Sequence, residues 1–187
     1  MTAQDVFRRI TRALDDARIA YMLTGSFASS YHGTPRATQD IDLVIQASPD
    51  QIRAFVAQLP SAEYYVDLAA ALRALKSEGQ FNVIDIATGW KIDLMSRKSR
   101  PFSQAEFDRR LAIELEGVPL YVATAEDVVV AKLEWAKRGG SERQIGDAAG
   151  ILRIRAGELD RPHIERWVRE LGLAAQWEAA CAAAEGP

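Results

Sequence analysis

Hydrophobic positions recur with two different periods along the chain, and these periods predict its elements. Residues 5–20 carry apolar side chains at helical spacing and predict an amphipathic helix. An apolar run at residues 21–23 predicts a strand that ends in a turn, and a second helix is expected at residues 27–31. After a loop at residues 32–38, residues 40–45 alternate strictly, which is typical of a strand with one buried face.

The middle of the chain predicts further helices and a hairpin. A capping-box pattern that begins at Ser48 predicts a helix starting at the following proline. Residues 62–77 are rich in alanine and leucine and predict another helix. Residues 81–87 and 90–95 predict two strands joined by a tight turn, which is a hairpin pattern.

The C-terminal part predicts only helices after a last strand at residues 118–122. Capping and breaking residues place these helices at 125–138, 142–154, 160–172 and 174–184, and Ser141 is the expected cap of the second. The sequence therefore predicts an α+β fold. Residues 1–123 are expected to form a mixed sheet packed with helices, and residues 124–187 a C-terminal helical region.

Composition narrows the class of protein without naming its chemistry. Of 187 residues, 48% are hydrophobic and 26% charged, which excludes a disordered chain. The formal charge of −3 argues against a protein that binds nucleic acid over its whole surface. No apolar run approaches the ~18–20 residues that span a bilayer, and the N-terminus lacks a secretory pattern, so we expect a cytoplasmic protein that makes no membrane contact. The single cysteine, Cys181, excludes an internal disulfide.

Acidic residues on the alternating strand carry the first candidate chemistry. Asp40 and Asp42 are two positions apart, so they point to the same face of the strand. Adjacent carboxylates repel each other unless a cation lies between them, and hard oxygen ligands of this kind suit Mg²⁺. Upstream, Gly25 permits a tight turn, and Ser26 stands at the predicted beginning of a helix, where free N–H groups favour a phosphate.

A third carboxylate is expected from the hairpin. Asp93 lies in the second hairpin strand, and Asp85 in the first is the alternative. If the hairpin lies beside the strand of Asp40, three carboxylates share one end of a sheet and could hold two metal ions roughly 3.5–4 Å apart. The alternative interpretation for each acid is a solvated strand position, and for Gly25 and Ser26 a simple turn and helix cap.

These motifs together resemble the nucleotidyltransferase superfamily related to DNA polymerase β. The resemblance rests on Thr24-Gly25-Ser26, on Asp40-Ile41-Asp42 and on the later Asp93. It implies a metal-dependent enzyme that moves a nucleoside monophosphate from an NTP to a hydroxyl acceptor, with two Mg²⁺ ions held by Asp40, Asp42 and Asp93. It also implies that Gly25 and Ser26 bind the triphosphate.

The downstream sequence is similar to the AbiEii/AbiGii toxin branch of bacterial nucleotidyltransferases. This similarity rests on residues 125–133 and the later Asp147, and it implies that Lys132 lies near the nucleotide. It favours the toxin half of a toxin–antitoxin pair, with a tRNA end as candidate acceptor and an antitoxin protein as partner. Two alternatives stay open: a small-molecule modifier such as an antibiotic nucleotidyltransferase, and a non-catalytic member that binds nucleotide or a partner.

Basic and hydroxyl-bearing residues near the acids complete the candidate set. Arg36 and Thr38 lie in the loop just before Asp40, where they are candidates for nucleotide binding, and Arg36 is equally compatible with a plain surface position. A second basic group could steer a polyanion toward Asp93, although charge clusters usually form solvated faces. Its members are Lys91, Arg97, Lys98 and Arg100.

Overall fold

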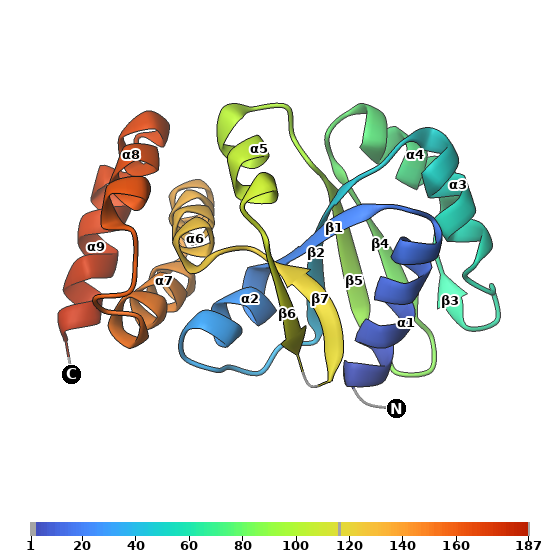
Figure 1. The fold of residues 1–187 in the computed structure, drawn as a ribbon, viewed down its shortest axis with the longest axis horizontal. Helices are drawn as coiled ribbons and strands as arrows, with labels where there is room; N and C mark the ends of the chain where they lie inside the picture. Colours follow the sequence, from blue (N-terminus) through green and yellow to red (C-terminus); the bar gives the residue numbers. More distant parts are fainter. Residues whose placement is uncertain (1–2, 116, 187) are drawn as a thin grey trace. The chain divides into compact units, whose positions relative to one another are not determined.

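The computed structural model describes residues 3–115 and 117–186 and has the predicted α+β architecture (Figure 1). Within these residues the strands are β1 (Ala20–Thr24), β2 (Asp40–Gln46), β3 (Tyr64–Tyr65), β4 (Gln80–Asp85), β5 (Lys91–Ser96), β6 (Leu111–Leu115) and β7 (Val118–Val122). The helices are α1 (Ala3–Asp16), α2 (Gly25–His32), α3 (Pro49–Ala57), α4 (Leu68–Lys76), α5 (Pro101–Asp108), α6 (Ala125–Gly139), α7 (Glu142–Ile154), α8 (Arg161–Leu171) and α9 (Ala174–Glu185). None of the described helices is both long and apolar enough to cross a bilayer.

The strands form one mixed sheet in the order β3-β4-β5-β2-β1-β7-β6. The predicted hairpin is confirmed, because β4 and β5 pair antiparallel. Strand β5 also pairs with β2 in parallel, so the hairpin lies beside the strand that carries Asp40. The β1–β7 pair is parallel as well, and β6 and β7 form a second hairpin.

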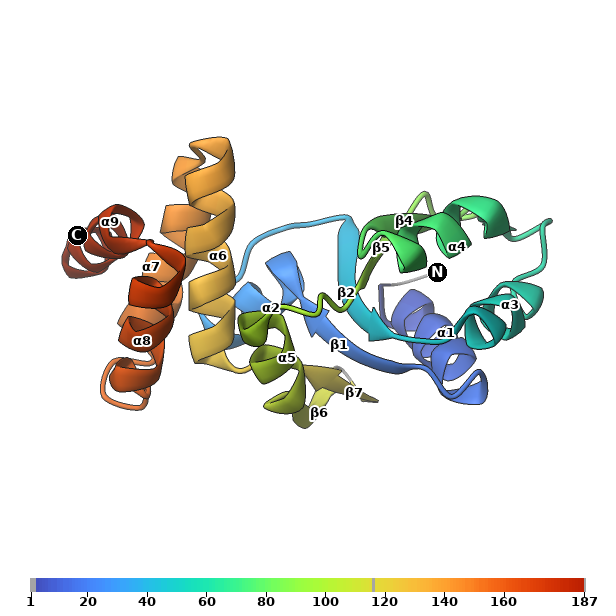
Figure 2. The same cartoon turned by 90° about the horizontal axis from the view of Figure 1, so that it is seen from above.

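The alternation in β2 sorts its side chains between the core and the other face of the sheet. The exposed fraction of Ile41, Leu43 and Ile45 is at most 1%, whereas Asp40 is exposed and Asp42 half-buried. Helices α1, α3 and α4 lie on one face of the sheet (Figure 2). Apolar burial on that scale is the main force that holds the strand in register, since a shift by one residue would bury the acids instead.

The beginning of α3 is held by the predicted capping box. The Ser48 hydroxyl accepts a hydrogen bond from the Gln51 N–H at 3.3 Å, and the Gln51 side chain accepts one from the Ser48 N–H at 2.8 Å. Two helix-end donors are thereby satisfied without tertiary help. This explains why the sequence alone located the helix.

Ser48→Ala is expected to lower the free energy of unfolding by about 1 kcal/mol, because the N–H of Gln51 loses its acceptor. Urea unfolding followed by circular dichroism measures this loss. Ser61→Ala, which changes an exposed turn serine in the same way, should leave the unfolding midpoint unchanged. Equal midpoints for wild type and Ser48→Ala would contradict the role of the cap.

The structure differs from the sequence prediction between residues 60 and 115. The single helix predicted over 62–77 is wrong in its first part, where Tyr64 and Tyr65 form β3 and pair with β4 before α4 begins. Strand β6 and helix α5 were not predicted. Residues 111–115 become a strand because they pair with β7. The local sequence pattern of these residues does not reveal that partner.

By compactness the chain forms two units. We call them the sheet unit, Met1–Leu23 with Thr38–Val122, and the helical unit, Thr24–Ala37 with Ala123–Pro187. The division expected from the sequence, 1–123 and 124–187, treats both parts as continuous and stays a prediction. Helices α6 to α9 pack together in the helical unit (Figure 2).

Close backbone packing joins the segment after α2 to α7 within the helical unit. A Cβ on Gly33 would lie 2.8 Å from the backbone nitrogen of Ile151, a distance that real Cβ atoms do not show. A Cβ on Gly150 would lie 3.0 Å from the Thr34 hydroxyl. The two glycines therefore allow residues 33–34 to lie directly against the α7 backbone, which explains why residues 24–37 group with the C-terminal helices.

Candidate active site

The acids of the sheet unit meet on two neighbouring parallel strands. In the β2–β5 pair, Asp42 lies directly opposite Asp93, and Asp40 lies directly opposite Lys91. Alternation puts Asp40 and Asp42 on one face of β2 and Lys91 and Asp93 on the same face of β5. The three predicted carboxylates and one ammonium group thus share a single patch of the sheet, which we call the carboxylate patch.

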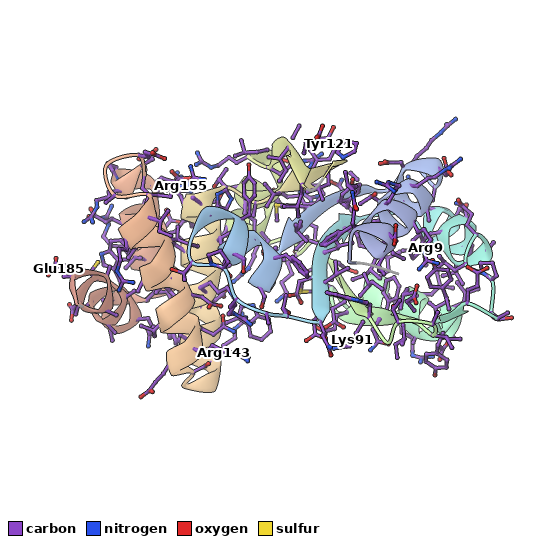
Figure 3. The ribbon with its side chains drawn as sticks, turned by 90° about the horizontal axis from the view of Figure 1, so that it is seen from below. Arg9, Lys91, Tyr121, Arg143, Arg155 and Glu185 are labelled. Carbon is purple, nitrogen blue, oxygen red and sulfur yellow. The ribbon has the colours of Figure 1, made fainter. Side chains whose placement is uncertain are left out.

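The interactions of Asp93 set it apart from the other two acids. Asp93 is 8% exposed, and its Oδ2 accepts a hydrogen bond from the Lys91 Nζ at 2.7 Å. Its Oδ1 is buried and finds no hydrogen-bond partner among the residues that the structure describes. Figure 3 shows Lys91 beside the beginning of β2. A buried carboxylate oxygen without a donor is unusual, and it leaves one lone-pair acceptor of the patch available to a ligand.

The charge of Lys91 follows from these neighbours. The pKa of Lys91 is raised above its ordinary value, chiefly by the hydrogen bond to Asp93, while partial burial opposes the change. Coulombic attraction to Asp93, Asp40 and Asp42 raises it further. Lys91 therefore stays protonated, and all three acids act electrostatically on one point of the patch.

The chemistry of the patch fits a hard divalent cation, although no complete ligand cage is present. Carboxylate oxygens from adjacent strands, one of them unpaired, are the donors that Mg²⁺ prefers. Within residues 3–115 and 117–186, however, no group of three or more His, Cys, Asp or Glu side chains is arranged to hold a metal ion. The Lys91 ammonium occupies the Asp93 Oδ2 that such a cage would use.

Asp85, the alternative third carboxylate, has a structural role. It is 1% exposed and accepts hydrogen bonds from the backbone and the hydroxyl of Thr88, at 3.0 and 2.7 Å, in the turn after β4. It also forms an ion pair with Arg9 of α1. These contacts tie the turn to the first helix, and the acid lies opposite Tyr64 of β3 rather than in the carboxylate patch.

Four candidate residues meet within the helical unit. Asp147 of α7 pairs through Oδ1 with the Arg36 Nε at 3.1 Å and through Oδ2 with the Lys132 Nζ at 2.7 Å. Arg36 also donates a hydrogen bond through Nη2 to the Ser26 hydroxyl. Lys132 is buried, with 5% of its side chain exposed. We call this set the basic cluster; within it, one carboxylate holds two cations in place.

Gly25 begins α2 in a conformation that suits its expected role. Its φ of +64° lies in the left-handed region, which glycine adopts without the penalty of a Cβ. The following N–H groups of α2 belong to the first helical turn, whose donors lack partners inside the helix. Ser26 is therefore at the beginning of a helix as predicted, with its hydroxyl already joined to Arg36.

Thr38 contacts the beginning of the acidic strand β2. Its hydroxyl accepts a hydrogen bond from the backbone N–H of Asp40 at 3.3 Å, which fixes the beginning of β2. In the described residues this is a structural contact of the sheet unit, and the proposed nucleotide contact of Thr38 stays a prediction.

His32 is buried, although it was predicted to lie in a loop. It is the last residue of α2, is 4% exposed, and donates through Nε2 to the Ala123 carbonyl at 2.7 Å. Burial lowers the pKa of His32 below its ordinary 6.5, and the carbonyl contact opposes this only in part. The imidazole is therefore neutral at pH 7.

His32 should make the fold less stable in mild acid. Because its pKa is lower in the folded than in the unfolded chain, only the unfolded chain takes up this proton as the pH falls below about 6.5, and unfolding becomes easier. In His32→Gln the free energy of unfolding should fall less steeply across this range, as measured by urea titrations at several pH values. An unchanged slope in His32→Gln would refute the assignment.

Comparison with known proteins identifies the family of this chain and supports its fold. The family model described as a nucleotidyltransferase of unknown function (DUF6036) matches residues 4–145, which is most of the chain. The chain therefore belongs to this nucleotidyltransferase family. No curated protein matches the sequence.

Solved structures similar to this chain are nucleotidyltransferases of low sequence identity. An antigenic nucleotidyltransferase-like protein from Paracoccidioides brasiliensis is 16% identical, with a TM-score of 0.57 over 94% of this chain and 92% of that one. The lincomycin-bound lincosamide antibiotic adenylyltransferase LnuA is 12% identical, with a TM-score of 0.54 over 82% and 98%. ANT(2")-Ia in complex with adenylyl-2"-tobramycin is 15% identical, with a TM-score of 0.51 over 97% of both chains. At these identities the likeness shows the fold alone.

Two contacts in these clusters were missed by sequence reasoning. Lys91 was considered only as part of a basic surface, although its spacing of two from Asp93 on a predicted strand already put both on one face. Asp147 was considered mainly as a helix-surface acid. No local signal joins it to Arg36, which lies 111 residues earlier in the chain.

Proposed function

We propose that the chain is a metal-dependent nucleotidyltransferase that moves a nucleoside monophosphate from an NTP to a hydroxyl acceptor. The observation that carries the proposal is the register of Asp42 opposite Asp93 on neighbouring parallel strands, in a chain that belongs to a nucleotidyltransferase family. Such a carboxylate pair next to a second acid is the donor arrangement that divalent-metal phosphoryl chemistry uses.

The residues of the carboxylate patch have separate roles in this proposal. Asp40, Asp42 and Asp93 would hold Mg²⁺, two ions being expected, and bound Mg²⁺ would neutralise charge that develops on the phosphate oxygens. The acceptor hydroxyl attacks the α-phosphorus, and the bond from that phosphorus to the pyrophosphate oxygen breaks, so pyrophosphate leaves with the electron pair. Asp93 accepts the hydroxyl proton, and its unpaired Oδ1 is the suitable atom.

The basic cluster would bind the triphosphate. Gly25 and Ser26 offer N–H groups at the beginning of α2, and Arg36 and Lys132 offer positive charge. Asp147 positions both cations before the ligand arrives, which lowers the entropy lost on binding. Thr38 is proposed as a further contact to the nucleotide.

Two classes of acceptor are candidates for this reaction. The AbiEii/AbiGii-like motif supports an RNA acceptor such as a tRNA end, and with it the toxin role and an antitoxin protein as partner. The fold shared with the two antibiotic adenylyltransferases, whose structures hold adenylyl-2"-tobramycin and lincomycin, supports a small-molecule hydroxyl as second candidate.

A labelling assay tests the proposal. The protein is incubated with Mg²⁺ and each α-labelled NTP, and tRNA, the product of the neighbouring gene and hydroxylated antibiotics are added in turn as acceptors. Transfer of label to one acceptor, with release of pyrophosphate, is the expected result, and the labelled acceptor decides between the two candidates. Absence of transfer to any of them would contradict the enzymatic proposal.

Calorimetry separates the enzyme from the non-catalytic alternative. An enzyme of this kind should bind NTP in the presence of Mg²⁺ and turn it over, whereas a binding protein of the same fold should bind without turnover. Absence of heat with every NTP would reject both.

A further inference from the structure

One cation lies among the three acids of the carboxylate patch, and it is supplied by the chain itself. The Lys91 Nζ is 2.7 Å from the Asp93 Oδ2, which is the distance of a strong charge-assisted hydrogen bond. In the β2–β5 register Lys91 lies opposite Asp40, and Asp93 lies opposite Asp42. Three carboxylates and one ammonium leave the patch with a net negative charge.

The position of Lys91 conflicts with metal binding at Asp93. A divalent cation held by Asp93 needs the same carboxylate lone pairs that now accept the Lys91 proton, and two positive charges on one carboxylate repel each other. The ammonium and the metal ion therefore compete for this group. The absence of a ready three-carboxylate cage in the described residues is consistent with that competition.

Lys91 is the more solvent-exposed member of its ion pair with Asp93. Its side chain is 40% exposed, whereas that of Asp93 is 12% exposed, so the lysine is the mobile partner and the acid the anchored one. Its departure takes one hydrogen bond from the buried Asp93 carboxylate, and a divalent cation bound there would replace the ammonium as the partner of that charge. The triphosphate of a nucleotide would offer the released ammonium a new anionic partner.

We propose that Lys91 is an internal counter-ion that occupies Asp93 in the free protein and competes with the divalent cation. Metal loading is thereby weak until a nucleotide arrives with its own negative charge. This inference rests on the proposed function, because it concerns the same carboxylates. Lys91 acts here as a positioning residue that sets the order of binding.

Binding of Mn²⁺ alone, measured by electron paramagnetic resonance of the free ion without nucleotide, tests the proposal. Lys91→Met should bind Mn²⁺ roughly threefold to tenfold more tightly than wild type, because the competing cation is removed. Lys91→Arg keeps the charge and should bind Mn²⁺ as weakly as wild type. Lys76→Met removes an exposed lysine of α4 and controls for the change in net charge.

The possible results separate this inference from the proposed function. Equal or weaker Mn²⁺ binding by Lys91→Met, or equal tightening by Lys76→Met, would overturn the counter-ion while the enzyme proposal stands. Absence of Mn²⁺ binding by every variant, with and without ATP, would overturn both. ATP should raise the Mn²⁺ affinity of the wild type more than that of Lys91→Met, because the variant has no lysine for the nucleotide to displace. This result would support the inference a second time.

Discussion

Asp42→Asn should lower the rate of the proposed nucleotidyl transfer by a factor of about 10³ or more, because it removes one charge from the carboxylate pair that we propose to hold the metal ions. The amide has nearly the same shape as the carboxylate, and Asp42 is half-buried at an ordinary strand position, so the fold should survive. The measurement is a single-turnover assay with α-labelled NTP and the acceptor identified by screening, together with thermal unfolding of the variant.

Asp50→Asn is the matched control for this experiment. Asp50 lies on α3 of the same unit, its side chain is 95% exposed, and its ion pair with Arg53 is a surface contact. The same chemical change there should leave the rate within a factor of about two, because surface pairs contribute little. Comparable activity of Asp42→Asn and Asp50→Asn would exclude Asp42 from the reaction.

Asp147→Ala should lower the free energy of unfolding by about 3–5 kcal/mol, because it leaves the buried ammonium of Lys132 without this acceptor. Arg36 loses the same partner, yet its side chain is 27% exposed and can turn toward water. The larger share of the loss therefore belongs to Lys132. Urea unfolding at pH 7 measures the effect.

The double variant Lys132→Met/Asp147→Leu distinguishes the loss of a charge pair from a simple loss of packing. It removes both charges and keeps similar volume, so it should regain most of the stability that Asp147→Ala loses. A double variant as unstable as Asp147→Ala would show that the charge pair is not the cause. Nucleotide binding should stay weak in the double variant, since the basic cluster has lost Lys132.

These two experiments probe different physical demands on acidic residues. Asp42 is half-buried on β2 and lies opposite Asp93, so its replacement by asparagine is expected to affect the reaction more than folding. Asp147 pairs with two cations, one of them buried, so its removal is expected to affect folding and nucleotide binding together. A buried acid that pairs with cations should thus change the free energy of unfolding, whereas an acid that faces a ligand should change the rate of the reaction.

Local physical rules were sufficient for most of the elements and for part of the candidate site. The capping box at Ser48 located α3, strict alternation located β2, and the spacing of two put Asp40 and Asp42 on one face. Each of these inferences depends on interactions within about one helical turn or between next neighbours in a strand. Such interactions are contained in the order of the residues, so no knowledge of distant partners was needed.

Long-range pairing determined the rest. Strand β3 exists because Tyr64 and Tyr65 find a partner in β4, and Asp93 meets Asp42 because β5 pairs with β2 in one particular register. Asp147 reaches Arg36 across 111 positions of the chain. Register is selected by the combined burial of many apolar side chains, so its outcome belongs to the folded chain as a whole and cannot be read from any one segment.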